Sequence, residues 1–499
     1  MKRPQLSTTI LLVFIQLVGI GNVSGQPNER RPNVLFIALD DLNDWVGSLG
    51  GKTGIKTPNI DRLASEGILF TKAYCSAPSC TPSRTSILTG KSPSTTGIYD
   101  LIRYHWRDNP ILADAVTLPQ HFRNHGYRTM GSGKIFHALS WINENYGTNQ
   151  NDARSWNEYF PSVDQPMPQD TWPEGSQQSD HVIKWQPVAK AEENRVPPYY
   201  FDFSPLDIPD DSTSDYQVAS WASEQLQQAH DTPFFLAAGF FRPHIPWFVP
   251  KKYFDLYPLE DIDLPLSPED DLEDLGETGR QIGAERRRWH QWLVNNGLWK
   301  EALQAYMASV SYADAQIGRI LDALANGPNA DNTIVILWSD HGFHLGEKQT
   351  WEKFTLWEES GRIPLIIKAP GVSIPGSRFN KPVSLLDIYP TLADLCDLPD
   401  VEGLDGESLK PYIVNPDEED DRFVVTTFGY MNHAVRSSRW RYICYEDGSE
   451  ELYDHDHDSG EFYNLATKKE YEGVKRVLKR KIPKANVKPY RPPTIGQSP

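Results

Sequence analysis

The sequence predicts an α/β protein whose core is a large, mixed but mostly parallel sheet flanked by helices. Three runs of strand length are apolar without alternation, at residues 33–39, 234–241 and 333–338. Continuous apolarity is typical of a strand that is buried on both faces. Each run is followed by Asp or His residues. In open α/β sheets, ligands bind beyond the carboxyl ends of the strands, so we expect a site there.

Helix signals follow the strand signals along the chain. After the first run, Thr57 and Pro58 are a typical N-cap and first helical residue, and Gly67 is a typical stop. Residues 299–325 have the spacing of a long amphipathic helix, which ends at the Asn-Gly-Pro sequence of 326–328. A strand followed by a helix is the beginning of a parallel sheet.

The hydrophobic pattern of the sequence changes after about residue 416. We expect short antiparallel strands and then a helix-prone stretch, at residues 423–427, 434–436, 440–444, 451–454 and 468–481. This pattern predicts a small α+β domain. The chain is therefore divided into a leader at 1–25, a large domain at 30–415, which contains the expected site, and a C-terminal domain at 416–490.

The N-terminus has the order of a secretory signal peptide. Lys2 and Arg3 precede an apolar run at residues 10–20, and small residues follow at 23–25. The alternative is a buried N-terminal helix. Since the run is too short for a bilayer span and no longer apolar run follows, we expect no membrane segment. The sequence thus predicts export, either to a periplasm or outside the cell.

The net charge and the number of cysteines exclude some classes of function. The formal net charge is −18, from 49 basic and 67 acidic residues, which excludes a nucleic-acid partner in the absence of a basic stripe. A polyanionic substrate would need a locally basic pocket or a screening ionic strength. The four cysteines are too few for a disulfide scaffold. Cys396 and Cys444 either pair with each other or remain buried free thiols.

Two segments look like insertions over the sheet. Residues 141–215 are rich in Trp, Asn, Pro and Asp, and residues 258–290 are first acidic and then basic. Long insertions of this kind often form lids over a site. The alternative is that they are solvent-exposed loops without a function. They are the candidate determinants of specificity.

Residues 80–90 (CTPSRTSILTG) carry the strongest functional signal. Pro82 near a helix start leaves Cys80 at the helix N-terminus, where backbone N–H groups favour an anion. The whole segment resembles the signature of type I sulfatases, in which a maturation enzyme oxidises this cysteine to formylglycine. The resemblance implies an alkaline-phosphatase-like sulfatase fold and a sulfuric ester hydrolase. A hydrated aldehyde can attack sulfur with one hydroxyl and expel sulfate with the other, an exit that plain Ser or Cys lacks.

The resemblance also implies a metal site. Asp40 and Asp41 after the first strand, and Asp340 and His341 after the last, match the family's metal pairs and join Cys80 in the predicted site. Carboxylate ligands suit Ca²⁺, with Mg²⁺ possible. His341 departs from many relatives, which have Asn there, although the iduronate-2-sulfatase-like branch also has His.

Further residues match catalytic positions of the family. Lys134 in the Gly-Lys-Ile-Phe-His segment would hold sulfate and the nucleophile, and His137 would hydrogen-bond the nucleophile's hydroxyl. Arg84 would clamp the same group. The resemblance implies that His244 protonates the leaving alcohol and that Lys353 is a second sulfate-binding lysine. His344 is interpreted as a structural or supporting histidine rather than a ligand.

The motifs around these residues look most like iduronate-2-sulfatases, so the expected substrate is a sulfated saccharide. Plausible sugar contacts are Tyr104, Trp106, Trp247 and His433. Two alternatives remain open: a phosphodiesterase or phosphonate monoester hydrolase of the same superfamily, and a catalytically silent carbohydrate-binding protein.

Overall fold

The computed structural model describes residues 31–102, 104–137, 151–161 and 201–491. The predicted leader and most of the first predicted insertion lie outside these residues. Among the described helices, none has the length and apolarity to cross a membrane.

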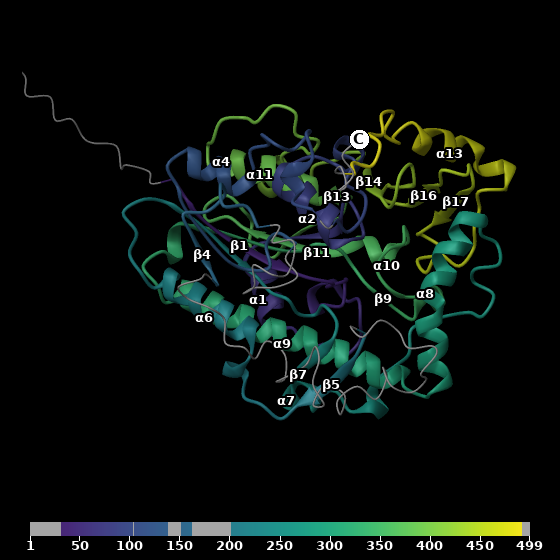
Figure 1. The fold of residues 1–499 in the computed structure, drawn as a ribbon, viewed down its shortest axis with the longest axis horizontal. Helices are drawn as coiled ribbons and strands as arrows, with labels where there is room; N and C mark the ends of the chain where they lie inside the picture. The colour runs from purple at the N-terminus through teal and green to yellow at the C-terminus, as the bar shows by residue number, and fades with distance from the viewer. Residues whose placement is uncertain (1–30, 103, 138–150, 162–200, 492–499) are drawn as a thin grey trace, which may run out of the picture.

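A mixed sheet forms the centre of the described chain (Figure 1). Its strand order is β12-β2-β11-β8-β1-β6-β3-β4, with β13 also paired to β2. Only β11 runs antiparallel to its two neighbours, and the other pairings among these described strands are parallel. The strands are β1 (Asn33–Leu39), β2 (Ile68–Tyr74), β3 (Arg128–Gly133), β4 (Glu158–Phe160), β6 (Phe234–Gly239), β8 (Thr333–Ser339), β11 (Arg362–Lys368), β12 (Ser377–Phe379) and β13 (Val383–Ser384). The predicted fold class is confirmed.

Helices cover both faces of this sheet (Figure 1). Strand β1 shows why its sequence is apolar throughout: Leu35 and Ile37 point into one core, and Val34 and Phe36 into the other. One face carries α1 (Pro58–Glu66), α6 (Ser214–Leu226) and α9 (Trp299–Ala325), and the other carries α2 (Cys80–Thr89), α4 (Leu118–Asn124) and α11 (Ile388–Leu395). The predicted helices that begin at Pro58 and Trp299 are both confirmed.

A four-stranded antiparallel sheet follows near the C-terminus, in the order β14-β15-β16-β17. Its strands are β14 (Val424–Thr427), β15 (His433–Arg436), β16 (Trp440–Cys444) and β17 (Glu450–Asp454), and α13 (Glu472–Lys479) packs on it. These match the predicted segments, except that the helix is shorter because a 3₁₀ turn occupies Lys469–Tyr471. The proposed boundary at residue 416 stays a prediction.

The predicted insertion at residues 258–290 contains a helix that the sequence pattern did not predict. Helix α8 (Glu277–Asn295) contacts β10 (Trp351–Glu352) and runs along the side of the molecule beside the C-terminal sheet (Figure 1). It therefore borders the segment that carries Lys353. The remaining short elements are α3 (Pro93–Thr96), α7 (Lys251–Phe254), α10 (Glu358–Gly361), α12 (Lys410–Val414), and the strand pairs β5 (Phe203–Leu206) with β7 (Trp247–Pro250) and β9 (His344–Leu345) with β10.

Candidate active site

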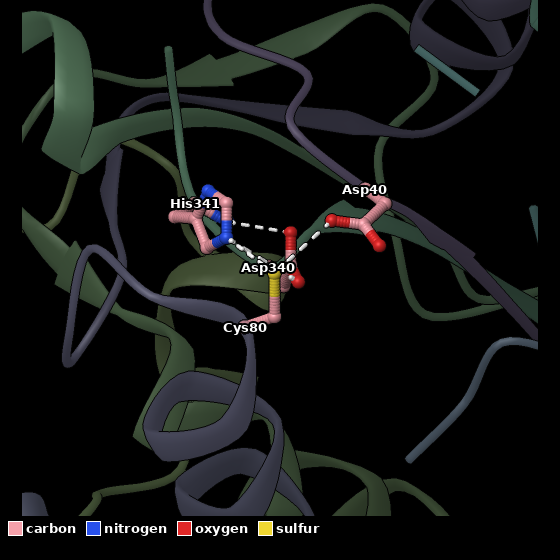
Figure 2. Close-up of side chains that lie close together, drawn as sticks. All are labelled: Asp40, Cys80, Asp340 and His341. Atoms are coloured by element: carbon pink, nitrogen blue, oxygen red, sulfur yellow. Dashed lines mark hydrogen bonds and ion pairs between the residues drawn. The ribbon is translucent and has the colours of Figure 1, made fainter. Parts of the chain in front are cut away.

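The carboxyl ends of β1 and β8 and the N-terminus of α2 meet at one point (Figure 2). The two strands are parallel neighbours, so Asp40 and Asp340 leave the sheet side by side. Cys80 is the first residue of α2, and its Sγ lies 3.5 Å from Asp40 Oδ1. His341 Nε2 is 3.2 Å from the same sulfur. All four side chains are buried.

The turn after β1 is held in an unusual conformation. Asp41 has φ +65°, a region that residues other than glycine seldom adopt, so the surroundings must stabilise it. Its N–H donates to Asp340 Oδ1 at 3.3 Å, and its carbonyl accepts from the Tyr306 hydroxyl at 2.9 Å. The next N–H, of Leu42, donates to Ser339 Oγ at 3.0 Å. Groups from β8 and α9 thus fix where the Asp41 carboxylate lies.

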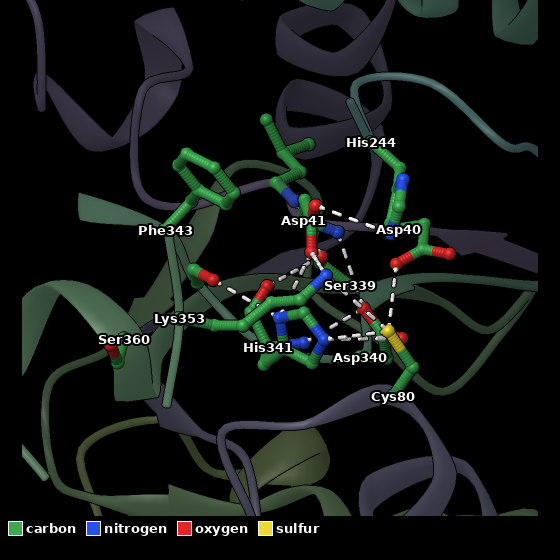
Figure 3. A network of polar contacts seen from close by, with 12 residues as sticks. Asp40, Asp41, Cys80, His244, Ser339, Asp340, His341, Phe343, Lys353 and Ser360 are labelled. Carbon is green, nitrogen blue, oxygen red and sulfur yellow. Dashed lines mark hydrogen bonds and ion pairs between the residues drawn. The ribbon is translucent and has the colours of Figure 1, made fainter. Parts of the chain in front are cut away.

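Two lysines face the carboxylates, and Figure 3 shows one of them, Lys353. Lys353 Nζ lies 2.6 Å from Asp41 Oδ1 and 3.5 Å from Cys80 Sγ. Lys134, which follows β3, forms an ion pair with Asp40 Oδ2. Both side chains are almost fully buried. The two lysines thus place buried positive charge in the site although the whole chain has a formal net charge of −18.

Arg84 occupies the floor of the site. Its Nε donates to Asp340 Oδ2 at 2.8 Å, and its Nη2 donates to the Leu39 carbonyl at 3.0 Å. Its Nη1 donates to the carbonyls of Lys134 and Ile135. All three guanidinium nitrogens therefore bond to groups of the protein, and the arginine ties β1, β8 and the segment after β3 together.

Three histidines belong to the site, and His341 contacts the sulfur. His341 Nδ1 is 3.0 Å from the Gly342 carbonyl, which can only accept, so Nδ1 carries the proton and Nε2 offers its lone pair toward Cys80. Burial lowers the pKa of His341 to about 4. Burial and then the charge of Lys134 lower the pKa of His137 well below its usual value.

His244 reaches the site from the segment after β6 (Figure 3). Its Nδ1 bonds to the Ile245 carbonyl, and its Nε2 lies 3.8 Å from Asp41 Oδ2. The side chain is 19% exposed, so it lies where the buried group meets solvent. Burial and then the charge of Lys353 lower its pKa well below the usual value.

The ligand atoms fit a divalent cation. Asp40, Cys80, Asp340 and His341 each offer an atom, all within 4.8 Å of one another. Asp41 Oδ2 is buried without a hydrogen-bond partner among the described residues. Burial raises the pKa of Asp41 to about 8 in spite of Lys353. Burial also opposes ionisation of Asp40, but Lys134, His244 and Arg84 hold its pKa well below the usual value. Concentrated carboxylate oxygens are the ligands that Ca²⁺ and Mg²⁺ prefer.

The structure brings the predicted site residues together from six separate segments. They are Asp40, Asp41, Cys80, Arg84, Lys134, His137, His244, Asp340, His341 and Lys353. His344 lies outside the ligand cluster of the described residues, and its Nε2 bonds to Thr355 Oγ1 at 2.8 Å. Its interpretation as a structural histidine agrees with this contact.

The predicted sugar contacts at Trp106, Trp247 and His433 are wrong because these side chains are buried. Trp106 is 0% exposed and stacks on Phe136, with ring centroids 5.8 Å apart. Trp247 is also 0% exposed and belongs to the core around α9. His433 is 1% exposed and bonds to Thr427 within the C-terminal sheet. Tyr104 is half-buried, and its hydroxyl donates to the Tyr490 carbonyl at 3.2 Å.

All four cysteines are free thiols, including Cys396 and Cys444. Of the two readings left open for that pair, the structure therefore has the free thiols. Cys396 lies in the core beside α11, whereas Cys444 lies at the end of β16.

Sequence reasoning missed the residues that support the site from behind, such as Tyr306 and Asp215. Tyr306 lies on α9 in a run of apolar residues and reads as an ordinary core residue. Asp215 reads as an acid in the first turn of α6. Their partners are distant in the sequence, so no local signal identifies them.

Comparison with known proteins gives one consistent result. The sulfatase family profile matches residues 32–398, and a profile described as N-sulphoglucosamine sulphohydrolase, C-terminal, matches residues 346–488. A sulfatase of Formosa agariphila is 38% identical over 488 residues, covering 95% of this chain and 92% of that protein. The iduronate 2-sulfatase of Mus musculus is 32% identical over 430 residues, covering 79% of this chain and 74% of that protein.

The fold comparison agrees. The crystal structure of the phosphonate monoester hydrolase of Agrobacterium radiobacter superposes with a TM-score of 0.72 at 22% identity, covering 90% of this chain and 94% of that chain. This confirms the alkaline-phosphatase-like fold. The profile match and the two relatives above 30% identity also confirm the resemblance that residues 80–90 indicated. The protein is a member of the sulfatase family and a sulfuric ester hydrolase.

Proposed function

We propose that the protein removes sulfate from a sulfated saccharide and that Cys80 is converted to formylglycine by a maturation enzyme. The observation that carries the proposal is the place of Cys80, at the N-terminus of a buried helix with Lys353 and His341 within 3.5 Å of its sulfur. Formylglycine, once hydrated, supplies one hydroxyl that attacks sulfur and a second that later releases sulfate.

A divalent cation, Ca²⁺ or alternatively Mg²⁺, would be held by Asp40, Asp41, Asp340 and His341. It would supply positive charge to the sulfate oxygens and to the attacking hydroxyl. Arg84 keeps two of these carboxylates in place through its contacts with Asp340 and Asp40. We assign it a positioning role in the site, since its donors already bond to the protein.

The two lysines bind and orient the sulfate group. Lys353 and Lys134 lie on either side of the Asp40–Asp41 pair, so each can donate to a different sulfate oxygen. Sulfate transfer depends mostly on such positioning and on stabilisation of the charge that develops in the transition state. His137 would hydrogen-bond the hydroxyl at position 80.

His244 would donate a proton to the bridging oxygen of the leaving alcohol. Its position at the solvent edge of the cluster supports this role, because the saccharide must extend outward from the buried sulfate group. The charge of a bound sulfate ester opposes the effect of Lys353 on the imidazole, and so favours its protonated form in the complex.

The iduronate-2-sulfatase-like specificity rests on the identity to the Mus musculus relative of that name and on the matching motifs. The phosphonate monoester hydrolase with the similar fold represents the competing function. We also propose export through the signal peptide at residues 1–25, and division of the mature chain near residue 416.

The test uses protein coexpressed with a formylglycine-generating enzyme. Mass spectrometry of the peptide that contains Cys80 should show an aldehyde. Hydrolysis should be measured as sulfate release from sulfated oligosaccharides of defined linkage and from 4-nitrophenyl sulfate, and as alcohol release from a phosphodiester. Cys80→Ala should abolish turnover and leave the thermal unfolding temperature nearly unchanged. An unmodified thiol in active enzyme, or faster turnover of the phosphodiester than of every sulfate ester, would contradict the proposal.

A further inference from the structure

Asp215 is a buried carboxylate that belongs neither to the metal cluster nor to the sulfate-binding lysines. It is the second residue of α6 and is 2% exposed. Its Oδ1 accepts the backbone N–H of Phe241 at 2.9 Å, and its Oδ2 accepts that of Arg242, also at 2.9 Å. One side chain thus binds two consecutive peptide groups of the segment that carries His244.

These peptide groups need an acceptor because the sheet has ended. Strand β6 stops at Gly239, and the last hydrogen bond to the neighbouring strand runs from the Phe240 N–H to the Ala38 carbonyl at 2.8 Å. A buried N–H without a partner costs about 1–3 kcal/mol. Where the chain turns away from the sheet, the Asp215 carboxylate accepts the two N–H groups that a neighbouring strand would otherwise accept.

Short contacts continue from Asp215 to His244. The peptide group between Phe241 and Arg242 donates its N–H to Asp215 Oδ2, and its carbonyl accepts the His244 N–H at 2.9 Å. Arg242 donates to the Phe248 carbonyl at 3.1 Å, which closes the far side of the same turn. The imidazole is then oriented by the bond from Nδ1 to the Ile245 carbonyl.

We propose that Asp215 is a positioning residue for His244: it fixes the backbone from which the imidazole reaches the leaving oxygen of the substrate. The inference rests on the proposed role of His244. A positioning role differs from a purely structural one in a measurable way. Proton donation matters greatly when the leaving alcohol is a poor leaving group, such as a sugar, and little when it is 4-nitrophenol.

The test compares kcat/KM of the formylglycine-containing enzyme on a sulfated sugar and on 4-nitrophenyl sulfate. Asp215→Asn keeps the size of the side chain but replaces one acceptor by a donor. We expect it to lower kcat/KM on the sugar roughly 10- to 100-fold, less than the roughly 10²–10⁴-fold that a proton donor itself contributes, and on the nitrophenyl ester by less than about threefold. His244→Gln should show the same selectivity with a larger loss. The double variant should lose little more than His244→Gln alone, because both changes act on one step.

Asp314→Asn is the matched control. Asp314 is likewise 2% exposed and accepts two consecutive backbone N–H groups, of Asn59 at 3.1 Å and Ile60 at 2.8 Å, but it supports α1. Its replacement should leave the ratio of the two kcat/KM values unchanged. If Asp215→Asn does not fold, Asp215→Glu, which keeps the charge and moves the acceptors, is measured instead.

The outcomes separate the two proposals. An equal loss on both substrates in the Asp215 variant, with a selective loss in His244→Gln, would overturn the positioning role and leave the proposed function intact. Equal losses in His244→Gln itself would overturn the role of His244 as proton donor. A selective loss in both variants, absent from Asp314→Asn, is the result that we expect.

Discussion

Lys353 Nζ lies 2.6 Å from Asp41 Oδ1 and 3.5 Å from Cys80 Sγ, so a single cation contacts both the candidate metal ligands and the candidate nucleophile precursor. Replacing Lys353 by Met keeps the length of the side chain and removes its charge. We expect kcat/KM to fall roughly 100- to 1,000-fold, the usual cost of removing one group that stabilises transition-state charge. Steady-state kinetics on 4-nitrophenyl sulfate measures this loss. Retention of more than a tenth of the activity would contradict the assigned role.

Divalent cations should stabilise the folded protein through the carboxylates around Cys80. A cation that binds only the folded state at 100 times its dissociation constant adds about 2.7 kcal/mol, so chelation should lower the unfolding temperature and Ca²⁺ should restore it. Asp340→Asn should reduce this response. Asp44→Asn is the control, because Asp44 pairs with Arg362 at 3.0 Å and lies outside the ligand clusters found among the described residues. Calorimetry with and without Ca²⁺ decides, and an equal response in both variants would argue against the site.

The elements of the fold that the sequence predicts best are those in which every residue is buried. Strands β1 and β8 are buried on both faces, so their sequences are apolar at every position. Strand β3 is also paired on both sides, between β6 and β4, and is buried after its first residue, but its sequence (RTMGSG) contains two glycines, and no pattern identifies it. Strand β11 begins Arg-Ile-Pro and runs antiparallel to its neighbours. These two segments form strands because of the neighbouring strands with which they pair. A single sequence does not show which strands pair with each other.

The predictable part of the site consists of residues within motifs. Cys80 and Lys134 stand in recognisable segments, whereas Asp215 and Tyr306 support the site through contacts with residues distant in sequence. The aromatic side chains misled the interpretation for a related reason. Trp106 is a residue type that often stacks on sugars, but only its packing against Phe136 shows that its ring is inaccessible.

The C-terminal sheet holds the segment that carries Lys353. Arg441 Nη1 donates to the Leu356 carbonyl at 2.9 Å, and the same guanidinium pairs with Glu358 and Glu461. Breaking a buried pair leaves an unpaired charge, so Arg441→Met should lower the free energy of unfolding by about 3–5 kcal/mol. It should also lower kcat under conditions where the variant is folded.

Arg439 provides the comparison for Arg441 within the same sheet. It is 44% exposed and pairs with Asp454 at 2.6 Å. Arg439→Met should lower the free energy of unfolding much less than Arg441→Met, because exposed ion pairs contribute little. Urea denaturation of both variants gives the two free energies. Similar values would show that the Arg441 network does not hold the catalytic segment as argued.

Acid should destabilise the C-terminal sheet through His433. Burial lowers the pKa of His433 to about 4, so the folded protein holds this imidazole neutral. The unfolded chain, with an ordinary pKa of about 6.5, takes up the proton first as the pH falls. The contribution to stability is therefore complete above pH 6.5 and is lost progressively as the pH falls from about 6.5 to 4, to the extent of roughly 3 kcal/mol. Urea denaturation at pH 7, 5.5 and 4.5 should show a smaller loss of stability with falling pH in His433→Gln than in the wild type.

His457→Gln is the control for His433→Gln, since the His457 side chain is 75% exposed and meets water in both the folded and the unfolded state. Equal slopes for the wild type and His433→Gln would mean that other groups govern the acid response.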